Sequence, residues 1–139
     1  MKALATLVRL HKQLVNEKRA ELTEIEVGRE ALRDQSDRLA AEVESEKQFA
    51  AGSFEGGRSY PRYVRRIDAE RRVIATEIAK LDAAFVEAGE ALAAAYQDLK
   101  KYEITYDIRA GKLRAAAAKR DQAQLDEIAI TLHRRKHAG

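Results

Sequence analysis

The segment that decides the fold runs from Val64 to Ile130 and reads VRRIDAERRVIATEIAKLDAAFVEAGEALAAAYQDLKKYEITYDIRAGKLRAAAAKRDQAQLDEIAI. Alternating steps of three and four residues trace a seam along it, and sixteen of its twenty positions are apolar, against 45% of the whole chain. A 3.5-residue period kept over this length predicts a supercoiled helix that needs a partner along its seam. The seam consists of Val64, Ile67, Arg71, Ile74, Ile78, Leu81, Phe85, Ala88, Leu92, Ala95, Leu99, Tyr102, Tyr106, Arg109, Leu113, Ala116, Arg120, Ala123, Glu127 and Ile130.

The composition agrees with a coiled coil. Charged residues make up 35% of the chain and aromatic residues 6%, with one proline and no tryptophan. A two-helix rod has a seam but no buried centre for an active site, so the sequence predicts a protein that is not an enzyme and needs no cofactor. The absence of cysteine removes disulfides and thiolate metal sites from consideration.

Two observations bear on location. The apolar stretch from Ala3 to Val8 is too short for a signal peptide and is closed by Arg9. No apolar run approaches the roughly 20 residues of a membrane span. The expectation is a cytoplasmic, soluble protein.

One segment breaks the helical pattern. Residues 52–61 (GSFEGGRSYP) hold three of the seven glycines and the only proline. Gly56 and Gly57 are expected to supply positive φ in a turn, and Pro61 to stand in the first turn of a new helix after Ser59 or Tyr60. The predicted fold is all-α: two long helices forming an antiparallel coiled-coil hairpin with a C-terminal helical overhang. The boundaries are a single rod over 1–139, with a helix at 3–50, a turn at 51–60 and a helix at 61–134.

The first helix carries a seam of its own, in which nine of fourteen positions are apolar. In an antiparallel hairpin, the residue numbers of two facing residues add up to the same value along the whole pair. A value of 110 places the two seams opposite each other and leaves a short loop between the helices. Polar seam residues are expected to fix this register at some cost in stability: Lys18, Arg29, Ser36, Glu46 and Arg71. The predicted pairs are Ala50 with Tyr60, Val43 with Ile67, Leu32 with Ile78, Ile25 with Phe85, Leu22 with Ala88, Val8 with Tyr102 and Leu4 with Tyr106.

The end of the second helix has no partner within the hairpin. Its heptads continue past residue 107 to Ile130, with Gly111 as a point where the helix could weaken or bend. Residues 108–139 carry eight basic and three acidic groups, so the excess positive charge lies here. This favours an amphipathic helix that docks on a larger protein with an acidic surface. A frayed, solvated helix end is one alternative. Binding to nucleic-acid phosphates is another, disfavoured because Asp121, Asp126 and Glu127 interrupt the basic patch.

The turn region is a second candidate surface. Four of the eight aromatic residues lie there, and exposed aromatic side chains with arginine are typical of binding hot spots. The residues are Phe49, Phe54, Tyr60 and Tyr63, with Arg58, Arg62, Arg65 and Arg66. A structural alternative is that Phe49 and Tyr60 close the end of the seam.

His133 and His137 lie four residues apart, but a third metal ligand is missing, so a polar tail is the favoured interpretation.

The chain resembles the FliJ proteins of the flagellar type III export apparatus, which have the YscO-type injectisome stalks as relatives. The similar features are a short two-helix rod without cysteine and an apolar, basic N-terminus from Leu4 to Leu14. The stretch LKKYE at 99–103 and the tail QAQLDEIA at 122–129 also resemble the family pattern.

The resemblance implies a stalk similar to the coiled coil of the gamma subunit of rotary ATP synthases. Its two ends would insert into a hexameric export ATPase, and the rod would contact the export gate protein in the membrane and meet export chaperones. The protein would lie at the inner face of the membrane, attached only through its partners. The residues implied in ATPase binding are Leu4, Leu7, Arg9, Leu10, Lys12, Leu14, Leu125, Asp126, Glu127, Ile128 and Leu132. Those assigned to the gate are Phe49, Phe54, Tyr60, Arg62, Tyr63 and Arg66.

A different class of function also fits the heptads. In a homodimeric scaffold, the second helix would pair with its copy through Leu113, Ala116, Ala123 and Ile130. Solution mass separates this class from a monomeric hairpin.

Overall fold

The computed structural model describes residues 1–138, and they form two helices. Helix α1 spans Lys2–Ala51 and α2 spans Phe54–Ala138. This confirms the all-α prediction of two long helices. No helix of the described residues has a stretch long and apolar enough to cross a membrane.

The connection between the helices is shorter than expected. We placed a turn at 51–60 and the second helix from residue 61, but only Gly52 and Ser53 lie between α1 and α2. Gly56 and Gly57 are helical, and no described glycine has positive φ. Pro61 therefore lies inside α2, not in its first turn.

Ser53 explains the early start of α2. Its Oγ accepts a 3.3 Å hydrogen bond from the backbone N–H of Gly56, and its carbonyl accepts a 2.9 Å bond from the N–H of Gly57. A serine at this position satisfies an N–H group that the helix itself cannot pair. Glu55 adds a negative charge in the first turn, where the helix dipole favours it.

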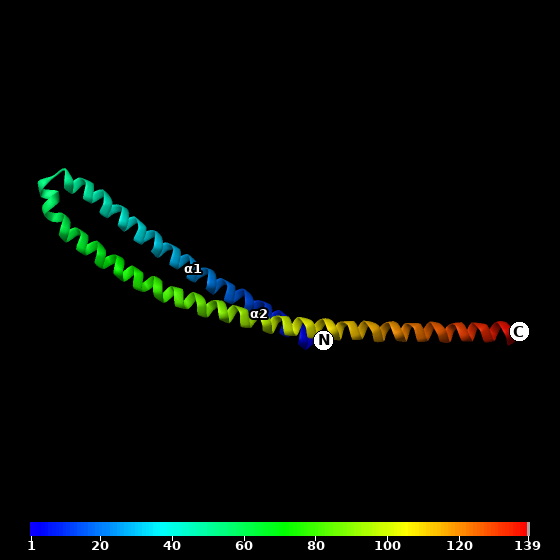
Figure 1. Ribbon diagram of the computed structural model, residues 1–139. Helices are drawn as coiled ribbons and strands as arrows, with labels where there is room; N and C mark the ends of the chain where they lie inside the picture. The colour runs from blue at the N-terminus through cyan, green and yellow to red at the C-terminus, as the bar shows by residue number, and fades with distance from the viewer. Residues whose placement is uncertain (139) are drawn as a thin grey trace. The chain divides into compact units, whose positions relative to one another are not determined.

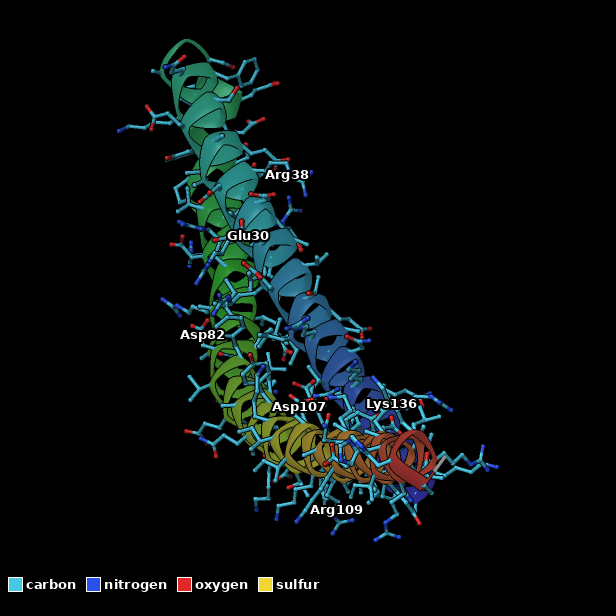
Figure 2. All side chains as sticks on the ribbon, turned by 90° about the vertical axis from the view of Figure 1, so that its right-hand side faces the viewer. Glu30, Arg38, Asp82, Asp107, Arg109 and Lys136 are labelled. Carbon is cyan, nitrogen blue, oxygen red and sulfur yellow. The ribbon has the colours of Figure 1, made fainter. Side chains whose placement is uncertain are left out.

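The chain forms two compact units, residues 1–14 with 95–139 and residues 15–94. In the second of these, the two helices lie side by side and are joined by the short connection (Figure 1). Its most buried apolar side chains are Val15, Ile67 and Ile74, which belong to the two predicted seams. Side chains such as that of Arg38 project outward from α1 (Figure 2).

Contacts within residues 15–94 agree with the predicted register. A Cβ built on Gly28 would lie 3.7 Å from Leu81 Cδ1, and Arg29 pairs with Asp82 at 3.0 Å. The residue numbers of these two contacting pairs add up to 109 and 111, on either side of the predicted value of 110. The polar seam residues also meet each other, since Arg71 Nε donates a 3.3 Å hydrogen bond to Ser36 Oγ.

In the unit of residues 1–14 and 95–139, the N-terminal part of α1 covers only the beginning of the α2 segment. Leu4 and Leu99 are its most buried side chains, and the ring of His11 stacks on Tyr102 with centroids 4.5 Å apart. Every apolar seam position of α2 up to Tyr106 is buried or half-buried, and every one from Arg109 on is exposed. The helix continues through Gly111 without interruption. Beyond the N-terminus, no other described residue of this unit lies beside the helix (Figure 1).

Candidate functional site

The main candidate site is the uncovered end of α2, residues 108–138, here called the tail. Its large apolar side chains are all more than half exposed: Ile108, Leu113, Leu125, Ile128, Ile130 and Leu132. Apolar area left open along a single helix is typical of a surface that binds a partner. Seen from the C-terminal end, side chains radiate from the tail (Figure 2).

The basic side chains of the tail form no ion pair within the described part of the chain. Among the described residues, none of its arginine or lysine side chains lies within 4.0 Å of a carboxylate. Asp126 accepts a 3.0 Å hydrogen bond from Gln122, one turn earlier on the same helix. The tail therefore presents basic groups that are free to pair with acidic groups of another molecule.

The three apolar residues of the tail that were predicted to bind the ATPase share one face of the helix. Leu125, Ile128 and Leu132 follow at spacings of three and four, which places them on one face of the helix. Ile128 and Leu132 line a shallow groove together with Gln124, Glu127, Thr131 and Arg135. Leu125 lies one turn before Ile128, outside the lining of this groove. The groove offers an apolar floor with charged edges to a partner helix or loop.

The predicted N-terminal contacts differ in accessibility. Leu4 is only 6% exposed, so its side chain lies in the helix pair and not on the surface. Leu14 is half-buried, whereas Leu7 and Leu10 are 38% and 48% exposed. Arg9 is also exposed, and Lys12 lines a surface groove with Val8, Glu103, Tyr106 and Asp107. The open apolar surface at this end is thus the strip formed by Leu7 and Leu10.

The stretch LKKYE, which we singled out in the sequence, lies on α2 beside the N-terminal residues. Tyr102 contacts His11, while Lys100 lies over the Tyr96 ring, with Nζ 5.3 Å from the centroid. Hydrogen bonding to Tyr96 raises the pKa of Lys100 above its ordinary value, and the charge of Glu103 raises it further. This stretch therefore contributes to helix pairing and to a charged outer surface.

The turn end, in residues 15–94, gathers the second set of predicted residues. Phe54 is 82% exposed and Phe49 63%, so the alternative in which Phe49 closes the seam is wrong. Tyr60 and Tyr63 are half-buried, and Arg66 lies 5.4 Å from the Tyr63 ring centroid. Tyr60, Arg62, Tyr63 and Arg66 line one surface groove together with Glu46, Gly56 and Ser59.

The electrostatics of this groove are mixed. Loss of water contact raises the pKa of Tyr63 above its ordinary value of 10.0, and the carboxylates of Glu42 and Glu46 raise it further. On the neighbouring face, Arg58, Arg62 and Arg65 line a second groove with Glu55. Two exposed phenylalanines together with this basic surface form the combination that is typical of a protein-binding surface.

The two histidines near the end of the tail contact each other. The rings of His133 and His137 lie edge to face with centroids 4.3 Å apart. No group of three potential metal ligands is found among residues 1–138.

Comparison with known proteins supports the resemblance seen in the sequence. The model of the family described as flagellar FliJ protein matches residues 1–138. No curated protein and no solved structure matched the chain. Since the family match extends over essentially the full length, this helical hairpin with an uncovered tail belongs to the flagellar FliJ protein family.

Proposed function

We propose that this protein is the non-enzymatic stalk of a flagellar export ATPase complex. The tail and the open N-terminal strip contact the hexameric ATPase and promote its assembly and activity. The turn end contacts the export gate protein, and the protein works on the cytoplasmic side of the membrane without crossing it. Export chaperones are further partners in this proposal.

The observation that carries the proposal is the change in exposure along α2. Its seam is covered up to Tyr106 and open from Arg109, although the helix itself continues to Ala138. A helix that keeps its apolar positions without an internal partner fits a protein that inserts one end into another molecule. Family membership makes a component of the flagellar export apparatus the fitting partner.

The test is the hydrolysis rate of the export ATPase from the same organism, titrated with this protein. Intact protein is expected to stimulate hydrolysis and to increase the fraction of assembled rings. Leu125→Ser, Ile128→Ser and Leu132→Ser combined should abolish stimulation, because they remove the apolar side chains of the tail groove and the exposed leucine one turn before it. These side chains are more than half exposed, so circular dichroism should show an unchanged helical fold.

The matched control changes exposed apolar residues at the turn. Phe49→Ser with Phe54→Ser should leave ATPase stimulation intact and weaken binding to the purified cytoplasmic domain of the gate protein. Equal stimulation by the tail variant and the intact chain would contradict the assignment of the tail. A competent ATPase that does not respond to the intact protein would instead favour the homodimeric scaffold.

A further inference from the structure

A row of arginines runs along α2 next to the turn. Starting at Glu55, alternating steps of three and four residues meet seven residues, of which four are arginine and one is acidic. All seven side chains are exposed. From its first arginine to its last, the row covers about 21 Å of helix. The residues of this arginine ridge are Glu55, Arg58, Arg62, Arg65, Ala69, Arg72 and Thr76.

The ridge faces away from α1. Arg65 and Arg72 each lie two residues before a buried seam residue, Ile67 and Ile74, whose side chains are 3% and 7% exposed. Two residues correspond to a rotation of about 200° around an α-helix, so the ridge and the seam lie on opposite sides of α2. Within residues 15–94, α1 lies along one side of α2 only (Figure 1). Another molecule can therefore contact the ridge without any change in the helix pair.

The guanidinium groups of the ridge are available to an anion. Among residues 15–94, none of the four lies within 4.0 Å of a carboxylate. Arg65 donates a 3.3 Å hydrogen bond to the carbonyl of Pro61, but it does so from Nε and not from the terminal Nη groups. Four arginines and one acid give the ridge a net charge of +3. The ridge is thus a strongly basic surface whose charges are not neutralised by the rest of the helix pair.

The residue type indicates which anion the ridge suits. Between Gln48 and Ala79 the chain has six arginines and no lysine, whereas the basic residues of the tail are a mixture of both types. The planar guanidinium group binds two oxygens of one phosphate or carboxylate at once, which an ammonium group does not do. Arg58, Arg65 and Arg72 are seven residues apart and follow each other at about 10 Å along the helix. This spacing suits several separate phosphate groups in a row.

Exposed apolar side chains lie beside the ridge. Phe54, the first residue of α2, is 82% exposed and lies four residues before Arg58, which places both side chains on the same side of the helix. Val73, next to Arg72, is 64% exposed. Apolar and aromatic side chains combined with basic groups are typical of helices that lie in the interface of a membrane.

We propose that the arginine ridge binds the surface of a membrane that contains anionic phospholipids. The guanidinium groups bind the lipid phosphates, and Phe54 inserts at the boundary between headgroups and acyl chains. Lipids move laterally, so phosphates can gather at each arginine of a helix face that is hollowed only by a shallow groove. An acidic protein would need carboxylates at matching intervals and a pocket for Phe54. The inference goes beyond the stalk assignment, because it attaches the protein to the membrane directly and not only through its partners.

Co-sedimentation of the full chain with vesicles tests the ridge. Vesicles of phosphatidylcholine and phosphatidylglycerol should bind the protein at low salt, and vesicles of phosphatidylcholine alone should bind it at least about tenfold more weakly. Arg58→Gln, Arg65→Gln and Arg72→Gln combined should weaken binding to the anionic vesicles by at least about tenfold. These side chains are exposed and lie outside the seam, so circular dichroism should show an unchanged helix content.

The matched control removes the same charge from the tail, the other basic surface of the chain. Arg109→Gln, Lys112→Gln and Arg114→Gln combined should change binding to the anionic vesicles by less than about twofold. An equal or larger loss with the tail variant would assign the membrane contact to the tail and overturn the proposal. An intact chain that does not bind anionic vesicles would also overturn it. If that chain bound a fluorescent hexaglutamate peptide through the ridge, the partner would be an acidic protein.

A tryptophan reporter tests the insertion of Phe54, since the chain has no tryptophan. The emission of Phe54→Trp should move to shorter wavelength with anionic vesicles and should be quenched by brominated acyl chains. Val27→Trp is the control, because Val27 is 63% exposed and lies on α1, two residues from the seam positions Ile25 and Arg29. Equal responses of the two reporters, or none from Phe54→Trp, would overturn the proposed orientation. The vesicles contain neither ATPase nor gate protein, so these results do not depend on the stalk assignment.

Discussion

Arg29 on α1 donates a hydrogen bond of 3.0 Å from Nη1 to Oδ1 of Asp82 on α2, across the seam of the helix pair. The guanidinium also lies 4.2 Å above the ring of Phe85. Arg33, one turn further along α1, approaches the same carboxylate at 3.6 Å. An arginine at a position that the heptad reserves for apolar residues is thus accommodated by an acid and an aromatic ring on the opposite helix.

This arrangement predicts measurable coupling between Arg29 and Asp82. Arg29→Ala should lower the free energy of unfolding by about 1–2 kcal/mol, because the side chain is largely covered and its stem packs in the seam. A double-mutant cycle with Asp82→Ala should give a coupling energy of about 0.5–1 kcal/mol, since Asp82 is half exposed and water screens the pair. The measurement is urea unfolding followed by circular dichroism.

The matched control is the pair of Lys80 and Glu77, which lie 3.2 Å apart on one turn of α2 and are both at least half exposed. Their coupling should stay below about 0.5 kcal/mol. Equal coupling in the two cycles would show that the contact across the seam adds nothing to an ordinary surface pair.

The seam also predicts where apolar truncation is costly. Leu99 is 6% exposed, whereas Leu113, at the equivalent heptad position two heptads later, is 56% exposed. Leu99→Ala should cost about 2–4 kcal/mol of unfolding free energy, and Leu113→Ala less than about 0.5 kcal/mol. Chemical unfolding of both variants checks this difference. A similar loss for Leu113→Ala would mean that the tail seam is covered in solution.

The heptads made much of this structure predictable. Apolar spacing identifies both helices, their antiparallel register and the point near Tyr106 where the seam loses its cover, because each follows from which residues can be buried. The start of α2 was misplaced. Glycines and a proline are strong turn signals, but the cap formed by Ser53 allows the helix to begin before them.

The exposed apolar residues of α2 outside its seam were not predicted. A seam followed in one fixed frame predicts which positions pack against α1, such as Leu99, but not which apolar side chains lie on the other faces of the helix. Ile104 and Ile108 are 57% and 54% exposed in the structure, although both lie near the covered seam.

Two glycines of α2 should respond oppositely to alanine. A Cβ on Gly56 would lie 3.0 and 3.1 Å from ring atoms of Phe49 and 3.3 Å from Cα of Ala50. The ring can move but the backbone cannot do so freely, so Gly56→Ala should loosen the turn and lower the melting temperature. At Gly111 the nearest atom is the end of the Arg114 side chain at 4.0 Å. Gly111→Ala should therefore stabilise the helix by up to about 1 kcal/mol through helix propensity alone.

Thermal unfolding of the two variants measures this contrast. Phe49→Ala combined with Gly56→Ala provides a control, because removing the ring relieves the closest contact and should recover part of the lost stability. An increase in melting temperature for Gly56→Ala alone would contradict the close packing of Phe49 on α2.

Pro61 should weaken the beginning of α2. It is the eighth residue of the helix and has no N–H group, so the carbonyl of Gly57 lacks its usual partner four residues later. Pro61→Ala restores this hydrogen bond and should raise the free energy of unfolding by about 1–3 kcal/mol. Hydrogen exchange should slow for the amides around residues 57–65, while those near Leu99 keep their protection. Pro61→Gly restores the N–H group without the helix propensity of alanine. Its free energy of unfolding should therefore lie between those of the intact protein and Pro61→Ala. Lower stability in Pro61→Ala would instead show that the proline ring is needed to hold the turn end, including Tyr60 and Tyr63, in place.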